Sequence, residues 1–195
     1  MISSPPALTG LLMGTLLSMA NELVNLVFGS WLESSFELKI AALGATAAII
    51  GFSELSGELL SAGLVDRLGK PRSMAAGILL NCLAALALLI TGRSLGGAVA
   101  GLFLFYLSFE FAIVSSIPLM TEVLPQARAT LMAAYVAFLS LGRAVGDVLA
   151  PPLYDPANRG SHFPGLLAIV FVVILLNLAA LLALSRLKRA VQEQG

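Results

Sequence analysis

The stretch Ser73-Met-Ala-Ala-Gly-Ile-Leu-Leu-Asn-Cys-Leu-Ala-Ala-Leu-Ala-Leu-Leu-Ile-Thr-Gly92 contains no charged residue. A helix rises about 1.5 Å per residue, so a helix of this length covers most of the roughly 30 Å hydrocarbon core of a bilayer. Residues 160–185 form a second run without Asp, Glu, Lys or Arg. These two runs predict membrane-crossing helices and place the chain among helical membrane proteins.

The composition of the whole chain agrees with this class. Of 195 residues, 58% are hydrophobic and 11% are charged, whereas a soluble domain carries about 25% charged residues. Eleven Lys and Arg balance eleven Asp and Glu, so no basic excess attracts nucleic acid, and we expect no nucleic-acid partner. Cys82 and His162 are single residues of their types. Sites built from several Cys or His are thereby excluded, and neither a metal nor a cofactor is expected.

Four further spans are predicted where apolar segments with isolated charges lie between loops rich in turn formers. The first segment lacks a basic n-region and carries polar residues, so we expect it to stay in the mature protein and not to be a signal peptide. The prediction is an all-α polytopic membrane protein with a single six-helix transmembrane domain over residues 1–195. The spans cover about residues 8–31, 40–64, 74–91, 95–119, 129–153 and 163–185.

The distribution of basic residues predicts the orientation, because Lys and Arg near span ends are retained in the cytoplasm. The side with both termini carries Arg67, Lys70, Arg72, Arg128, Arg186, Lys188 and Arg189, and the other side carries Lys39, Arg93 and Arg159. Both termini are therefore expected in the cytoplasm, with the plasma membrane of a prokaryote as the location. Trp31 and Tyr154 then fall at the outer interface, where amphipathic aromatic rings are favoured.

Six ionisable residues lie inside the predicted spans. They are Glu22, Glu54, Glu58, Glu110, Arg143 and Asp147. Each costs about 2.5 to 3.5 kcal/mol near a helix centre, and such residues commonly have a function. In one interpretation they line a polar pathway that binds a solute or protons. In the other, Arg143 forms an internal ion pair with Asp147 or Glu110 that holds helices together. The sequence leaves both interpretations open.

Two helix faces carry clear polar patterns. On the first span, Asn21 and Asn25 flank Glu22 and extend a polar stripe, which favours a functional role for this glutamate. Glu54 and Glu58 are four residues apart and share a face of the second span. They lie nearer the predicted cytoplasmic end, where gating or a solvated vestibule is as compatible with the pattern as solute contact.

Pairs of glycines spaced four residues apart occur in three places. They are Gly10/Gly14, Gly97/Gly101 and Gly142/Gly146. This spacing places two small residues on one helix face and allows another helix to approach closely. We therefore predict close helix packing at these positions.

The loop after the second span reads Ala62-Gly-Leu-Val-Asp-Arg-Leu-Gly-Lys-Pro-Arg72. It resembles the signature loop of the major facilitator superfamily, in which a glycine, an Asp-Arg pair, a further glycine and a basic cluster join the second and third helices of a six-helix half. The stretch Glu122-Val-Leu-Pro-Gln-Ala-Arg-Ala-Thr130, with Gly142-Arg-Ala-Val-Gly146 after it, is similar to the family's passage into a glycine-rich fifth helix. The resemblance covers almost the whole chain.

This resemblance implies a secondary active transporter that moves a small solute by alternating access, with a proton as a candidate coupling ion. Its first and fourth helices would line the cavity. The implied solute- or proton-binding candidates are Asn21, Glu22, Asn25, Glu110, Arg143 and Asp147. In the family the loop acts as a latch through its acidic residue, which implies a gating role for Asp66, Arg67, Gly69, Lys70 and Arg72. Without a latch, the same loop is a basic segment that sets topology.

The sequence departs from the family pattern in several respects. Ala62 stands where the first glycine is usual, Pro71 interrupts the basic cluster, and Asp147 stands where the antiporter motif has proline. Antiport is therefore not carried over. Family members usually have twelve helices in two halves, and this chain resembles one half, closer to the C-terminal one. The expected partners are a small-molecule substrate, the lipid bilayer and a second six-helix domain, supplied by another half or a homodimer.

Other classes of function compete with transport. An inactive fragment or a non-transporting membrane scaffold would have the same six helices. An intramembrane enzyme is not expected, because a serine protease needs a histidine at membrane depth and His162 lies in a loop, while the H-E-x-x-H motif of metalloproteases is absent. No catalytic residue is assigned.

Overall fold

The computed structural model describes residues 4–154 and 163–192, and within them the chain is all α-helical. The helices are α1 (Pro5–Phe36), α2 (Ile40–Leu68), α3 (Lys70–Thr91), α4 (Leu95–Val123), α5 (Arg128–Tyr154) and α6 (Phe163–Gln192), with a short 3-10 turn, η1 (Pro125–Ala127), before α5. Each helix from α1 to α6 is long and apolar enough to cross a membrane. The predicted fold class, six transmembrane helices of a half major-facilitator type, is confirmed.

Local sequence explains where several helices begin and end. Proline occupies the first turn of α1 and of α3, a position where a missing N–H costs nothing. The Ser94 side chain accepts a hydrogen bond from the Gly97 N–H at 3.2 Å and caps the start of α4. Gly69 ends α2 with φ of 88° and ψ of 137°. This positive φ with ψ outside the left-handed helical region is a conformation that strongly favours glycine.

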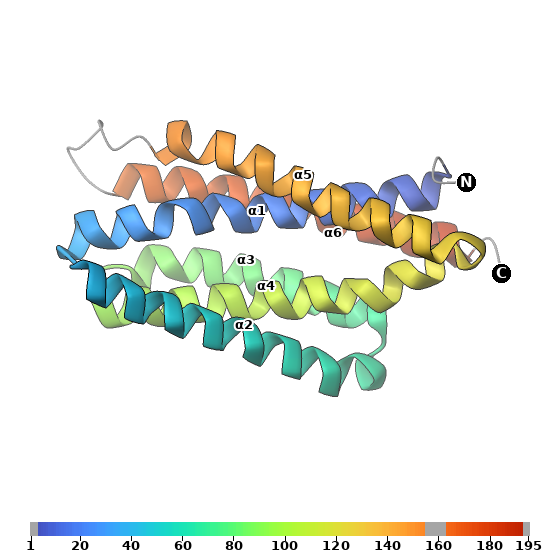
Figure 1. Cartoon of the computed structure of the whole chain (residues 1–195), viewed down its shortest axis with the longest axis horizontal. Helices are drawn as coiled ribbons and strands as arrows, with labels where there is room; N and C mark the ends of the chain where they lie inside the picture. Colours follow the sequence, from blue (N-terminus) through green and yellow to red (C-terminus); the bar gives the residue numbers. More distant parts are fainter. Residues whose placement is uncertain (1–3, 155–162, 193–195) are drawn as a thin grey trace.

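The six helices form two groups of three that lie side by side (Figure 1). In one group α1 packs against α5 and α6, and in the other α4 packs against α2 and α3. The groups meet where α1 contacts α4 and where α3 contacts α6. The two chain ends lie at the same end of the bundle as the turn between α2 and α3 (Figure 1). Loops therefore alternate between the two ends, as a six-span membrane topology requires.

Buried apolar side chains form two clusters along the length of the bundle. The cluster nearer the chain ends includes Leu11 of α1, Met120 of α4 and Leu184 of α6. The other includes Leu23 of α1 and Leu102 of α4. Because α1, α3, α4 and α6 each contribute to both clusters, the level between them falls near the middle of these helices. Polar side chains gather at this level.

Three glycines allow two helix pairs to approach closely. A Cβ at Gly142 would lie 2.3 Å from the Thr15 carbonyl oxygen, and one at Gly146 would lie 2.8 Å from the Glu22 Cβ, so both glycines press α5 against α1. A Cβ at Gly77 would lie 2.7 Å from the Ala112 Cβ, which brings α3 against α4. The packing role predicted for the pair on α5 agrees with this geometry.

The two aromatic residues predicted for the outer interface are buried within the bundle. Trp31 is 3% exposed and Tyr154 is 8% exposed, and both belong to a buried apolar cluster. The Trp31 ring lies against Gly92 at the turn between α3 and α4. The indole fills the space that Gly92 leaves at the end of the bundle opposite the chain termini (Figure 1), and the position of both rings at the outer interface stays a prediction.

Candidate functional site

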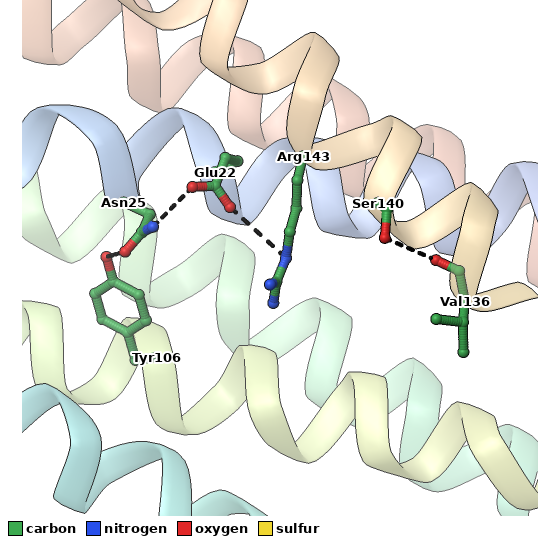
Figure 2. A network of polar contacts seen from close by, with 6 residues as sticks. All are labelled: Glu22, Asn25, Tyr106, Val136, Ser140 and Arg143. Atoms are coloured by element: carbon green, nitrogen blue, oxygen red, sulfur yellow. Dashed lines mark hydrogen bonds and ion pairs between the residues drawn. The ribbon is translucent and has the colours of Figure 1, made fainter.

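A polar network joins three helices near their middles (Figure 2). The Asn25 Nδ2 donates a hydrogen bond to the Glu22 Oε1 at 2.7 Å within α1. The Tyr106 hydroxyl of α4 donates to the Asn25 Oδ1 at 3.2 Å. From α5, the Arg143 Nε lies 3.8 Å from the other carboxylate oxygen of Glu22. Glu22 is therefore held between an amide and a guanidinium, and the network links α1, α4 and α5.

The close packing of α5 on α1 positions the charged pair. Gly146 faces the Cβ of Glu22, and Gly142 faces the backbone at Thr15. Arg143 lies between these two glycines in sequence, so its side chain leaves α5 beside this contact and extends toward α4 (Figure 2). The sequence Gly142-Arg-Ala-Val-Gly146 thus brings α5 and α1 together and places the Arg143 guanidinium beside the Glu22 carboxylate.

The network opens to the outside of this six-helix unit. The Glu22 side chain is 11% exposed, whereas the Arg143 side chain is 62% exposed. Asn25 is also exposed, while Tyr106 is buried. The carboxylate is therefore set into the bundle, and the guanidinium lies on its surface, available to a further anionic group.

A second group of acidic side chains lies between α2 and α4. A Cβ at Gly57 of α2 would lie 2.9 Å from the Cβ of Glu110 on α4, and Gly57 stands between Glu54 and Glu58 in sequence. The three carboxylates therefore lie near one another where α2 packs against α4. The structure therefore brings charged residues of α1, α2, α4 and α5 into one polar face.

Two of the candidates predicted for this face lie apart from the network. Asn21 is 5% exposed, and its Oδ1 has no hydrogen-bond partner within residues 4–154 and 163–192. Asp147 is exposed on α5, and no ion pair includes it in the part of the chain that the structure describes. Arg143 pairs with Glu22 and with neither Asp147 nor Glu110, because the glycines of α5 place it against α1.

The predicted latch loop lies at the end of the bundle that holds both chain ends (Figure 1). Asp66, Arg67 and Arg72 are exposed. Lys70, the first residue of α3, forms an ion pair with Glu122 near the end of α4. The loop is thus tied to α4 by its lysine, and its aspartate is available to a partner outside this unit.

Two polar features were not predicted. Tyr106 joins the network through Asn25, and its position four residues before Glu110 on α4 is the signal that could have identified it. Asn177 of α6 donates to the Asn81 Oδ1 of α3 at 2.7 Å, and the Asn81 Nδ2 donates to the Phe105 carbonyl of α4 at 2.8 Å. An asparagine in each charge-free run indicates such an interhelical bond, because a polar side chain in lipid needs a partner.

The site contains groups that bind ions and polar solutes by charge and hydrogen bonding. No group of three or more His, Cys, Asp and Glu side chains is placed to hold a metal ion within the described ranges. Six helices that are long and apolar enough to cross a membrane are the architecture of an integral, multi-pass membrane protein.

Comparison with known proteins identifies the family. A family model described as the Major Facilitator Superfamily matches residues 10–194, and the chain belongs to this superfamily of transporters. The protein described as "Uncharacterized MFS-type transporter YceJ" of Bacillus subtilis (strain 168) is 25% identical over 145 residues. That match covers 74% of this chain and 37% of the relative, so the matched part spans well under half of the relative's length.

Proposed function

We propose that this chain is one half of a secondary active transporter that moves a small solute across the membrane by alternating access. The observation that carries the proposal is the network of Glu22, Asn25, Tyr106 and Arg143, which lies near the middle of three helices and opens to the outside of the unit. A solute site in this position would be reached from either side of the membrane as two units rock about it.

The charged groups of the face suggest separate roles. Arg143 is mostly exposed although Glu22 is beside it, so its guanidinium suits an anionic group on the solute. Glu54, Glu58 and Glu110 lie near one another, and no ion pair within 4.0 Å joins them to Lys or Arg among the described residues. Carboxylate oxygens accept hydrogen bonds and attract positive charge, which makes these three side chains candidates for binding a proton or another cation.

The proposed functional unit requires a second six-helix domain. Arg143 exposed to lipid would cost about 2.5 to 3.5 kcal/mol, and another domain over the same face would replace the lipid. The flanking helices α2 and α5 carry exposed apolar side chains as well, including Phe52 at 64% and Val148 at 73%. A second copy of the chain or another half would cover both features, because the two halves of such transporters share one orientation.

The orientation and location are part of the proposal. Seven Lys and Arg flank the spans on the side of the chain ends, against three on the other side, which favours cytoplasmic termini. A prokaryotic plasma membrane is the location that we propose. In this orientation the loop around Asp66 faces the cytoplasm and is placed to latch the second domain.

Proteoliposomes provide the test of transport. The full chain is reconstituted around the pH indicator pyranine, and panels of amino acids, sugars, organic acids and organic cations are added under an imposed pH gradient. We expect one solute class to change the proton flux. Glu22→Gln and Glu110→Gln should each lower that flux at least about tenfold, the effect of about 1.4 kcal/mol.

Glu33→Gln is the matched control, because Glu33 is exposed near the end of α1 and lies outside the polar face. Unchanged flux in both site variants, at equal incorporation, would remove the carboxylates from the mechanism. Crosslinking that finds only monomers in liposomes with full transport would exclude the need for a second unit.

A further inference from the structure

We infer that a pocket at the end of the bundle with both chain termini binds an anionic phospholipid. The pocket lies between the start of α3, the end of α4 and the end of α6, and has a volume of about 190 Å³. It lies apart from the polar face, since none of the network residues lines it. This inference does not depend on the proposed transport activity.

The walls of the pocket fit a hydrocarbon chain. Leu119 and Val123 of α4 and Leu184 and Leu187 of α6 line it, and these side chains belong to the buried apolar cluster. A cavity of roughly 150 Å³ lined by apolar side chains holds a benzene molecule. A volume of about 190 Å³ therefore accommodates several methylene groups of an acyl chain.

The rim of the pocket carries positive charge. Lys188 of α6 and Glu122 of α4 line it, and Lys70 neutralises Glu122 through their ion pair. Lys188 is exposed, and no ion pair includes it among the residues that the structure describes, so it supplies the positive charge of the rim. Arg186 and Arg189 are on the same last turns of α6 and add to the positive potential at this end of the bundle.

The pocket lies on helices whose outward faces are apolar. The outward faces of α3 and α6 carry exposed large apolar side chains along their lengths, among them Leu83 at 61% and Leu182 at 65%. These two helices contact each other, and in Figure 1 they pass behind α4 and α5. An acyl chain can therefore enter the pocket from the bilayer while its phosphate stays at the level of Lys188.

Together the apolar walls and the basic rim match both parts of an anionic phospholipid. A free phosphate would use only the rim, and a neutral lipid would use only the walls. Basic pockets between transmembrane helices at the cytoplasmic side are known to hold anionic head groups. Positive charge at this end also agrees with the anionic character of the cytoplasmic leaflet.

Native mass spectrometry of the full chain tests the inference. The protein is released from micelles that contain equimolar phosphatidylglycerol and phosphatidylcholine, and the lipid that it retains is measured. We expect preferential retention of phosphatidylglycerol, and Lys188→Gln should reduce that retention roughly fivefold, the contribution of one lysine near an anionic lipid. Lys188 is exposed, so this variant is expected to fold.

Lys39→Gln is the matched control, because Lys39 is an exposed lysine before α2 at the other end of the bundle. Equal retention of the two lipids, or an equal loss in Lys188→Gln and Lys39→Gln, would overturn the inference. Competition with glycerol 3-phosphate tests the acyl part of the site. Failure to displace phosphatidylglycerol at equal concentration is expected, and full displacement would show that the walls do not hold a chain.

Discussion

The substitution Gly142→Ala tests the contact that positions Arg143. The added Cβ would lie 2.3 Å from the Thr15 carbonyl oxygen, against about 3.4 Å for ordinary contact, so α5 must withdraw from α1 by about 1 Å. Overpacking of this kind costs about 1 to 3 kcal/mol, and the higher helix propensity of alanine offsets at most about 1 kcal/mol. The neighbouring Gly146 contact is expected to loosen too, because it lies on the same pair of helices.

The loss of stability is measured by thermal unfolding in detergent. After heating, gel filtration of the soluble fraction gives the amount of folded protein at each temperature. Gly142→Ala should lower the midpoint by several degrees, the shift that about 1 to 2 kcal/mol produces in a domain of this size. Gly51→Ala on α2 is the control, because nothing lies within 4 Å of its added Cβ. Equal midpoints for wild type and Gly142→Ala would refute the close contact between α1 and α5.

Two further predictions concern the polar side chains that join helices. Asn177→Leu leaves the Asn81 Oδ1 without its donor and should lower the free energy of unfolding by about 0.6 to 1.7 kcal/mol. Unfolding in detergent measures this loss, which should exceed the loss in Leu178→Ala on the exposed face of α6. Tyr106→Phe removes the hydrogen bond to Asn25 and should lower solute-dependent flux about twofold to tenfold, with unaltered flux as the contrary outcome.

The helices were predictable because their signals are long and strong. Each charge-free run is longer than a loop of a soluble protein would contain, and the segments between the spans contain turn formers. Six helices could therefore be expected from the residues alone. The helices extend past the predicted spans, for example from Pro5 to Phe36 in α1, because helical hydrogen bonding continues beyond the hydrocarbon core. Hydropathy locates the core of each helix better than its ends.

The partners of the charged residues were less predictable. The sequence indicated Asp147 or Glu110 as the ion-pair partner of Arg143, and the structure pairs it with Glu22. Which of these the guanidinium meets depends on the rotation of α5 about its axis, and that rotation is set by two glycines against α1. The burial of Trp31 was missed for a related reason, since the space beside Gly92 exists only after α3 and α4 have packed.

The proposed transport requires a water-filled pathway along the face that carries Arg143. Thiol accessibility in intact membrane vesicles tests this requirement most directly. Cys82 is buried and is the single native cysteine, so Cys82→Ala gives a background without thiols. On that background, Arg143→Cys should react with a charged, membrane-impermeant methanethiosulfonate. Leu83→Cys, equally exposed but on the lipid-facing side of α3, should not react, because a thiol in hydrocarbon does not form the reactive thiolate. Equal reactivity at the two positions, or none at position 143, would contradict the account.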